Sequence, residues 1–488
     1  MFSINAFLLK TQELSSPAIN SNSDQLNYEE FQKKVLKTAG ILSAMGLGDK
    51  DNIAIIGNSD VDFIINLLAL WQIKALPVLI NPRLINNEIK EQIITTDCKV
   101  VLQNRMIKSI DPSFDAKVFS YPFDEELEQD DIEPGEELNP EDTAVIIFTS
   151  GASGNSKGVE LSFNNLLQSA RIGDKIIHHY KEDRWLASLP FYHIGGFSII
   201  SRSLLFGTSI IIPESLQIQD LAEVMKNFNP TLCSFVPTQL KRMVEADILP
   251  NDELRITLLG GGFINQRLVF DAISDGWNIT KIYGSTETSS FVSSISDEEI
   301  YDKPKSVGTA VKPNQIMIVN ESRFQIPWGE VGEIAVSSPA VMKGYYNDVD
   351  ETEKKIEDGF YYTGDMGFVD ADNYLFIEAR RTDLIVTGGE NVNPNEVEKR
   401  LIEHPEIVDA AVFPLKDDDW GEIVAAAIIL KNEKSCIELN ELREFLKDDL
   451  AGFKIPKKLF IEKELPRNEL EKMLRSKLIE KYEGSQSL

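Results

Sequence analysis

The sequence predicts an α/β protein built from parallel-type sheets covered by helices, with a smaller α+β domain at the C-terminus. Two stretches of alternating apolar strands and amphipathic helices, the second ending near Tyr283, indicate two sheet-containing subdomains. From Gly329 to Ala379 the pattern changes to short strands separated by glycine and Asn-Asp turns, which is typical of a β-rich subdomain. At 488 residues the chain is also too long for a single core.

Hydrophobic periodicity gives the elements of the first two thirds of the chain. A helical repeat ends near Gly46 and Gly48, and an apolar run that stops at Gly57 predicts a buried strand. The predicted helices are 27–47 and 61–73, and the predicted strands are 52–57, 76–82, 143–148, 281–283, 332–338, 360–369 and 373–379.

A small α/β unit follows the segment RRTDLIVTGGENVNP. Its boundary is predicted near Arg381–Asp383, which divides the chain into residues 1–380 and 381–488. The predicted elements of this unit are helices 395–404, 439–450 and 470–482 and strands 408–413, 423–430 and 458–463.

The composition limits the partners of the protein. The formal net charge of −29 at pH 7 disfavours nucleic acid and anionic membranes, and eleven acids in residues 124–142 predict a solvated surface connection. The longest apolar run, 423–430, cannot span a bilayer as a lone helix. Cys98, Cys233 and Cys436 lie far apart, which argues against a disulfide framework or a cysteine metal site and favours the cytoplasm. We therefore expect small-molecule partners, and a homo-oligomer is compatible with the sequence.

The stretch TSGASGNSKG, residues 149–158, directly follows the strand 143–148. Its glycines permit backbone conformations in which amide groups face an oxyanion, while hydroxyls and a lysine add donors and charge. A P-loop pattern cannot be read through it, and by itself such a stretch is more often a solvated turn. The residues are Gly151, Gly154 and Gly158, then Thr149, Ser150, Ser153, Ser156 and Lys157.

Two further motifs follow predicted strands. In YGSTE the lone carboxylate of Glu287 lies among hydroxyls, as suits a Mg²⁺ ion already held by nucleotide phosphates. The glycines Gly260–Gly262 let a flat ligand approach the backbone closely. Taken alone, the first motif is equally compatible with a polar turn, and the glycine run is more often just a tight turn.

Three later residues belong with these motifs. Asp365 could accept hydrogen bonds from a ribose diol, and Arg380 could bind a phosphate or ribose oxygen. Lys472 begins a predicted helix. Alone, these residues are compatible with a β-turn, a surface ion pair and a solvated lysine.

The order and spacing of all these motifs, with LPFYHIGG between the first two, resemble the adenylate-forming superfamily of acyl-CoA synthetases, adenylation domains and luciferases. The resemblance covers nearly the whole chain, from Leu26 to Tyr482. It implies that the β-rich subdomain is barrel-like and that the C-terminal domain is mobile. It also implies a two-step reaction in which a carboxylate attacks the α-phosphorus of Mg·ATP, and a thiol, usually coenzyme A, then displaces AMP.

The resemblance implies a role for each motif residue. Lys472 would bridge the substrate carboxylate and the α-phosphate, and His193 would gate the approach of the acid. After rotation about a hinge at Thr382, the loop with Gly388, Gly389 and Glu390 would replace Lys472 and line the pantetheine tunnel. The ATP-binding set is Thr149, Ser150, Gly151, Ser153, Gly154 and Lys157 on the β,γ-phosphates, Gly260, Gly261, Gly262 and Tyr283 around the adenine, Gly284, Ser285 and Thr286 at the α-phosphate, Glu287 on Mg²⁺, Asp365 on the ribose and Arg380 on the ribose or phosphates.

Two positions depart from the superfamily pattern. Ala152 and Ser153 keep one hydroxyl where many members have two threonines, and Glu471 replaces the usual glycine beside Lys472. An acid next to the lysine would weaken its positive field, although neighbours on a helix point in different directions.

The segment 189–207, with its glycine pair after His193 and with Arg202, most resembles members of this superfamily that act on a dianionic aromatic acid, so the resemblance implies such an acid as substrate. Arg202 would supply a charge for it, unless this arginine lies on a helix surface, and Ser198, Ser285 and Ser289 would supply hydroxyls. The alternative hypotheses are a ligase for another aryl or fatty acid, an adenylation module that loads a carrier protein, and a nucleotide-binding protein without turnover.

Overall fold

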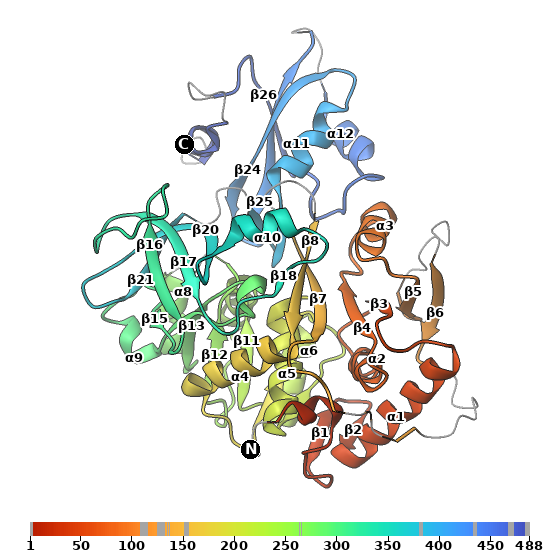
Figure 1. Cartoon of the computed structure of the whole chain (residues 1–488). Helices are drawn as coiled ribbons and strands as arrows, with labels where there is room; N and C mark the ends of the chain where they lie inside the picture. Colours follow the sequence, from red (N-terminus) through yellow and green to blue (C-terminus); the bar gives the residue numbers. More distant parts are fainter. Residues whose placement is uncertain are drawn as a thin grey trace. The chain divides into compact units, whose positions relative to one another are not determined.

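The computed structural model describes residues 3–107, 116–123, 132–133, 135, 137–150, 156–262, 264, 266–379, 384–432, 437–466 and 473–483. The chain divides into two compact units (Figure 1). The first unit comprises Met1–Pro82, Gln92–Phe148 and Gly158–Ala379, and the second comprises Arg83–Glu91, Thr149–Lys157 and Arg380–Leu488.

A seven-stranded sheet carries the first predicted subdomain. Its central strands pair in parallel, and the helices predicted at 27–47 and 61–73 are confirmed as α1 (Tyr28–Ala44) and α2 (Val61–Gln72). Asn27 and Glu30 form a capping box at the start of α1, which fixes where that helix begins. In sheet order, the strands are β18 (Gly344–Tyr345), β8 (Ser156–Ser162), β7 (Thr143–Ser150), β4 (Leu76–Ile80), β3 (Asn52–Ile56), β5 (Val100–Asn104) and β6 (Lys117–Tyr121), with α3 (Asn86–Thr95) between β4 and β5.

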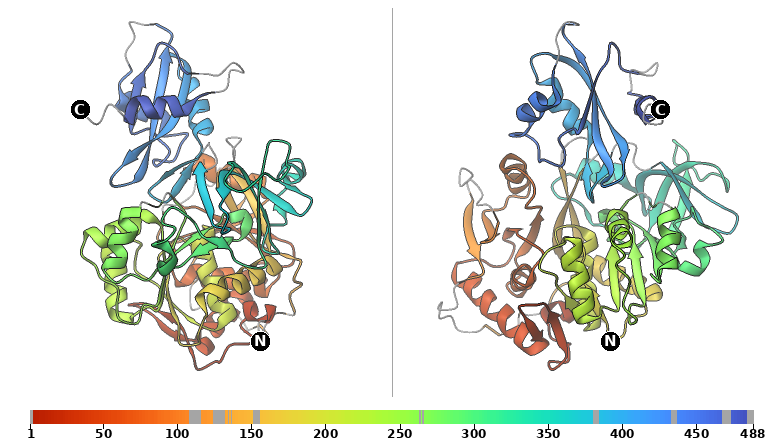
Figure 2. Two further views of the ribbon diagram at one scale, coloured as in Figure 1. Left: turned by 90° about the vertical axis from the view of Figure 1, so that its left-hand side faces the viewer. Right: turned by 180° about the vertical axis from the view of Figure 1, so that it is seen from behind.

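A nine-stranded sheet carries the second subdomain and is covered on both faces. Leu232 and Leu258 on one face pack in the core that contains α4 and α5, whereas Cys233 and Leu259 on the other face pack against α6, α7 and α8. Figure 2 shows these helices on the two sides of the sheet. In sheet order, the strands are β15 (Thr309–Ala310), β14 (Ser293–Ile295), β13 (Ile279–Tyr283), β12 (Ile256–Leu259), β11 (Leu232–Phe235), β9 (Arg184–Leu186), β10 (Ser209–Ile211), β1 (Pro17–Asn20) and β2 (Gln25–Asn27). The helices are α4 (Phe163–Ile177), α5 (Ile194–Phe206), α6 (Ile218–Phe228), α7 (Pro237–Glu245) and α8 (Gln266–Ser274).

The predicted β-rich subdomain is a curled antiparallel sheet (Figure 1). Its strands are β16 (Gln315–Val319), β17 (Gly332–Ser337), β20 (Phe360–Val369), β19 (Ile356–Glu357) and β21 (Leu375–Ala379). The remaining short helices of the first unit are η1 (Ile4–Leu8), η2 (Thr286–Thr288), α9 (Asp297–Ile300) and α10 (Val349–Lys355).

The second unit contains one sheet with helices on both faces. Val412 and Ala426 face α11 and α12, while Phe413 and Ala427 face the side of Leu478 on α13, as the alternation of side chains along a strand requires. The strands are β23 (Glu390–Val392), β22 (Ile385–Thr387), β25 (Gly421–Leu430), β24 (Ile407–Asp417) and β26 (Lys458–Ile461), and the helices are α11 (Pro394–Ile402), α12 (Leu439–Leu446) and α13 (Arg475–Glu483).

Two sequence expectations need correction. The helix predicted at 470–482 begins only at Arg475, because the amide of Leu474 donates to the carbonyl of Pro466 at 2.8 Å instead of entering a helical turn. The described part of the acidic connection is not entirely solvated, since Leu138 is buried and the amide of Gly135 donates to Gln72 Oε1 at 2.7 Å. Residues 124–131, 134 and 136 of that connection lie outside the described residues.

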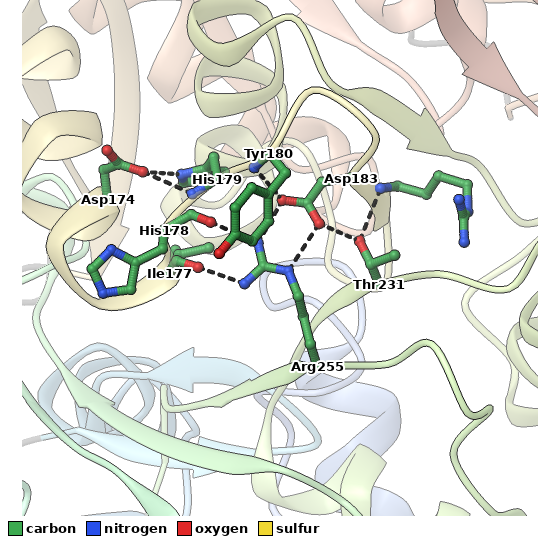
Figure 3. A network of polar contacts seen from close by, with 9 residues as sticks. Asp174, Ile177, His178, His179, Tyr180, Asp183, Thr231 and Arg255 are labelled. Carbon is green, nitrogen blue, oxygen red and sulfur yellow. Dashed lines mark hydrogen bonds and ion pairs between the residues drawn. The ribbon is translucent and has the colours of Figure 1, made fainter.

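A polar network fixes the end of α4 to the nine-stranded sheet (Figure 3). Arg255 donates to the carbonyl oxygens of Ile177 at 2.6 Å and His178 at 3.2 Å, which satisfies acceptors at the C-terminus of the helix. The buried carboxylate of Asp183 accepts from Arg255 Nε at 3.0 Å and from the hydroxyl of Thr231 at 2.6 Å. Burial alone would raise the pKa of Asp183, but these hydrogen bonds outweigh it and lower the pKa below its ordinary value.

Candidate active site

Two of the glycine-containing motifs lie at the same edge of the nine-stranded sheet. Strands β12 and β13 are parallel neighbours, and Gly260–Gly262 and Gly284–Glu287 follow their carboxyl ends. A Cβ at Gly260 would lie 2.8 Å from Ile282 Cγ1, and one at Gly284 would lie 2.0 Å from the carbonyl oxygen of Ser290. Only glycine therefore permits these close backbone approaches.

The residues predicted to surround the nucleoside are in direct contact. Tyr283 at the end of β13 donates its hydroxyl to Asp365 Oδ2 on β20 at 2.7 Å. The backbone amide of Asp365 donates to the hydroxyl of Thr363 at 3.0 Å, and that hydroxyl donates to the carbonyl of Ile334 at 2.7 Å. The carboxylate is thus held from both the tyrosine and its own strand.

The predicted metal carboxylate lies in a short helical turn. Glu287 on η2 is 1 % exposed and accepts a hydrogen bond at Oε1 from the hydroxyl of Tyr345 at 3.1 Å. Among the described residues no group of three or more His, Cys, Asp or Glu side chains could hold a metal ion. A single carboxylate is the donor set that suits Mg²⁺ bound mainly by phosphates and water.

Two buried hydroxyls in these motifs have no hydrogen-bond partner among the described residues. They are Thr149 Oγ1 at the end of β7 and Ser285 Oγ after β13. A buried hydroxyl without a partner is costly unless a ligand supplies the acceptor. Both therefore fit the phosphate-binding roles that the sequence assigns to them.

The rest of the phosphate stretch is described only in part. Ser156 Oγ donates to the carbonyl of Thr149 at 3.3 Å, and Lys157 and Gly158 lie on β8. A Cβ at Gly158 would lie 2.9 Å from Ile146 Cγ2, so this glycine is needed where β8 passes β7. Gly151, Ala152, Ser153, Gly154 and the side chain of Ser150 lie outside the described residues.

His193 is the N-cap residue of α5, and its ring contacts that of Tyr192 with centroids 4.8 Å apart. Of the two glycines that follow His193, Gly196 is required sterically, because a Cβ there would lie 2.1 Å from the carbonyl oxygen of Pro190. The helix therefore starts as close to residues 189–190 as a glycine allows.

Arg202 lies within the protein and not on a helix surface, with only 1 % of the residue exposed. Its terminal nitrogens donate to Ser198 Oγ at 3.3 Å and Ser169 Oγ at 3.4 Å, and its guanidinium lies over Phe291 at 5.3 Å and Trp185 at 5.9 Å. Its Nε has no hydrogen-bond partner, and no carboxylate of the described residues pairs with it. Burial lowers the pKa of Arg202 to about 10, so the group is still charged at neutral pH.

In the second unit, Gly388 and Gly389 form the two-residue turn between β22 and β23. Their φ angles of 58° and 86° are those of a hairpin turn that requires glycine. A Cβ at Gly388 would also lie 2.6 Å from Trp420 Cε3, and Glu390 is buried. Arg380, Thr382, Glu471 and Lys472 lie outside the described residues.

Sequence reasoning missed Tyr345, the residue that contacts Glu287. The two residues are 58 positions apart, and Tyr345 belongs to a two-residue strand that no periodicity reveals. The segment KGYYN offered no signal beyond a tyrosine pair.

Glycines at the ends of parallel strands, buried hydroxyls without a partner among the described residues and one buried carboxylate are the features expected of a nucleotide-binding enzyme of the α/β class. The family model described as AMP-binding enzyme matches residues 10–346, and the AMP-binding enzyme C-terminal domain matches residues 396–472. The chain therefore belongs to the AMP-binding enzyme family, which confirms the predicted superfamily.

Curated relatives match nearly the whole chain. The 2-succinylbenzoate–CoA ligase of Bacillus cereus (strain Q1) is 31% identical over 94% of this chain and 95% of its own length. That of Geobacillus sp. (strain WCH70) is 32% identical over 94% of both chains. These relatives confirm the predicted enzyme class, an AMP-forming acid–thiol ligase.

Solved structures show the same fold. A double mutant of o-succinylbenzoate CoA synthetase from Bacillus subtilis, bound with the product analogue OSB-NCoA, has a TM-score of 0.92 and 28% identity over 97% of this chain and 98% of its own. The same synthetase in complex with ATP and a magnesium ion has a TM-score of 0.74 and 28% identity over 97% and 99%. No helix of the described residues is long and apolar enough to cross a membrane.

Proposed function

We propose that this protein is an ATP-dependent o-succinylbenzoate–CoA ligase that acts in menaquinone biosynthesis. It converts the acid to its adenylate with release of pyrophosphate, and then to the CoA thioester with release of AMP. The observation that carries the choice of acid is the buried guanidinium of Arg202, which no carboxylate of the described residues neutralises.

The chemistry of the acid explains why such a cation is needed. o-Succinylbenzoate carries a succinyl carboxylate, which is activated, and a ring carboxylate, which stays charged throughout the reaction. A desolvated carboxylate is stable only when it is paired and hydrogen bonded. Arg202 would supply that pairing, whereas a fatty acid would gain nothing from it. The hydroxyls of Ser198 and Ser289, expected to contribute, instead donate to the carbonyls of Gly195 at 2.9 Å and Ala340 at 2.7 Å.

Residues of the motifs described above would bind and orient the nucleotide. The hydroxyls of Thr149 and Ser285 would donate to phosphate oxygens, and the Tyr283–Asp365 pair would hold the nucleoside. Mg²⁺ would neutralise charge on the phosphates, with Glu287 as its protein ligand. His193 and Lys472 would orient the attacking carboxylate, and Thr286 would contact the α-phosphate.

We further propose that residues 1–380 and 381–488 act as two domains with a hinge near Thr382. The turn Gly388–Glu390 would line the path of coenzyme A in the second step, after Lys472 has served the first. In this proposal, Lys472→Ala abolishes adenylate formation but leaves thioester formation from supplied acyl-adenylate largely intact. Equal loss in both steps would contradict the proposal that Lys472 serves only adenylate formation.

An acid panel tests the choice of substrate. Pyrophosphate release and acyl-CoA formation are measured with o-succinylbenzoate, with 4-oxo-4-phenylbutanoate, which lacks only the ring carboxylate, and with a medium-chain fatty acid. We expect a strong preference for o-succinylbenzoate in the wild type. Adenylate without acyl-CoA would indicate a carrier-protein loading module, and ATP binding without pyrophosphate release would indicate a protein without turnover.

The same panel with the variant Arg202→Met tests the proposed contact between Arg202 and the ring carboxylate. We expect kcat/KM for o-succinylbenzoate to fall at least 100-fold while that for 4-oxo-4-phenylbutanoate changes little. An equal fall for both acids would show that Arg202 does not recognise the ring carboxylate. The proposal also places the enzyme in the cytoplasm, and size-exclusion chromatography with light scattering will decide whether it is a homo-oligomer.

A further inference from the structure

The segment 340–346, between β17 and α10, connects two motifs of the active site. On one side it contacts the turn that contains Glu287, and on the other it pairs with β8, the strand that leaves the phosphate stretch. The contacts are Ser289 Oγ to the carbonyl of Ala340 at 2.7 Å, Asn165 Nδ2 to the carbonyl of Val341 at 2.8 Å, the amide of Met342 to the carbonyl of Glu287 at 2.8 Å, the amide of Lys343 to the carbonyl of Glu160 at 3.0 Å, and the amide of Tyr346 to the carbonyl of Gly158 at 2.8 Å.

One side chain of this segment reaches the carboxylate itself. The hydroxyl of Tyr345 lies 3.1 Å from Glu287 Oε1, and both residues are buried, at 5 % and 1 % exposure. A glutamate has three side-chain torsions, so its carboxylate is oriented only where neighbours fix it. Here the amide of Met342 holds the backbone of Glu287 and the hydroxyl of Tyr345 holds one carboxylate oxygen.

We infer that Tyr345 is a positioning residue for the metal-binding carboxylate of Glu287, and that the segment 340–346 fixes this carboxylate relative to β8. The inference rests on the metal-binding role proposed for Glu287. The hydroxyl of Tyr345 donates to Oε1 and so restrains the orientation of the carboxylate that would bind the cation. Because the same segment pairs with β8, the carboxylate is held relative to the strand that leaves the phosphate stretch.

The two tyrosines of the segment provide a matched pair of variants. Tyr345→Phe removes the hydroxyl that contacts Glu287. Tyr346→Phe removes a hydroxyl that instead accepts from Asn52 Nδ2 at 2.7 Å, outside the motif that contains Glu287. Both substitutions keep the aromatic ring, so the packing of the segment is preserved.

The test measures metal binding directly as well as activity. Mn²⁺ binding in the presence of a non-hydrolysable ATP analogue is followed by electron paramagnetic resonance, and adenylate formation is titrated with Mg²⁺ at saturating ATP. A hydrogen bond to a charged group is typically strong enough that we expect Tyr345→Phe to raise the half-saturating concentration of either metal about five- to tenfold. The KM for the acid and the midpoint of thermal unfolding should change little, and Tyr346→Phe should bind metal as the wild type does.

The variant Glu287→Gln distinguishes the metal-binding role of Glu287 from the positioning role of Tyr345. If Glu287→Gln weakens metal binding and Tyr345→Phe does not, Tyr345 has no positioning role and the inference is wrong. If Glu287→Gln itself leaves metal binding unchanged, the proposed metal role of Glu287 fails. If Tyr345→Phe and Tyr346→Phe weaken binding equally, the effect is a general one of the segment, which also overturns the role of the Tyr345 hydroxyl.

Discussion

The hydroxyl of Tyr283 donates to Asp365 Oδ2 at 2.7 Å, although the two residues are 82 positions apart and come from different sheets. The bond ties the motif after β13 to the β-rich subdomain. In the proposed nucleotide complex, the same carboxylate would accept hydrogen bonds from a ribose diol.

Tyr283→Phe should therefore loosen the nucleoside site without removing its aromatic surface. We expect the KM for ATP to rise about three- to tenfold, because a hydrogen bond to a carboxylate is lost, with a smaller change in kcat. Tyr374→Phe is the control, since its hydroxyl contacts Glu299 at 2.8 Å at an exposed position. Steady-state kinetics with varied ATP check this, and equal KM values for both variants would contradict it.

The glycine pair behind His193 offers a steric prediction. A Cβ at Gly196 would meet the backbone carbonyl of Pro190 at 2.1 Å, whereas one at Gly195 would meet only the tip of the Leu189 side chain at 2.9 Å. Gly196→Ala should lower the midpoint of thermal unfolding and move the start of α5, while Gly195→Ala should stay close to the wild-type midpoint. Equal midpoints for the two variants would show that the helix start adapts freely.

His179 predicts a dependence of stability on pH. Burial lowers the pKa of His179 to about 4, with a further lowering by Arg202, and these effects outweigh the hydrogen bond to Asp174 at 2.9 Å. The folded-state pKa is therefore below the ordinary value of 6.5, so this contribution to stability is present above pH 6.5 and is lost as pH falls toward 4. The loss between pH 7 and pH 5 should be about 2 kcal/mol.

The control for this prediction is the neighbouring histidine. His179→Gln should flatten the dependence of the denaturation midpoint between pH 7 and pH 5, whereas His178→Gln, at an exposed position, should leave the dependence as it is. Identical pH profiles for the wild type and His179→Gln would show that other groups dominate this range.

The Asp183–Arg255 contact should contribute more to the free energy of unfolding than a surface ion pair does (Figure 3). Asp183→Asn leaves the guanidinium of Arg255 without its carboxylate and should cost about 3 kcal/mol of unfolding free energy. Lys181→Ala breaks an exposed pair with Glu13, whose charged atoms are 3.5 Å apart, and should cost less than about 0.5 kcal/mol. Urea unfolding measures both, and similar values would contradict the importance of burial.

The local parts of the fold could be predicted because their signals are local. Asn27 and Glu30 mark the start of α1, and the apolar segments 52–57 and 76–82 contain strands β3 and β4. The start of α13 could not be predicted, since the bond from Leu474 to Pro466 competes with a continuous helical repeat.

The candidate site also has parts that the sequence could predict and parts that it could not. Glycines and hydroxyls after strands pointed to the motifs for which phosphate and metal binding is proposed. Those after β12 and β13 lie together because the two strands are parallel neighbours. The contact between Tyr345 and Glu287 depends on how the chain returns to β8, and no spacing rule encodes that return. For Arg202, the sequence left a surface position and a buried one open, and burial became visible only with Trp185 and Phe291 in place.

The burial of Arg202 also affects the protein before it meets any acid. A desolvated cation without an anion destabilises the fold that encloses it, so the ligand-free enzyme is expected to be less stable than its core could make it. In the proposed complex, the ring carboxylate of the acid completes an ion pair inside the protein. Binding of the substrate therefore stabilises the folded protein, because the same ion pair that recognises the acid also neutralises the buried charge.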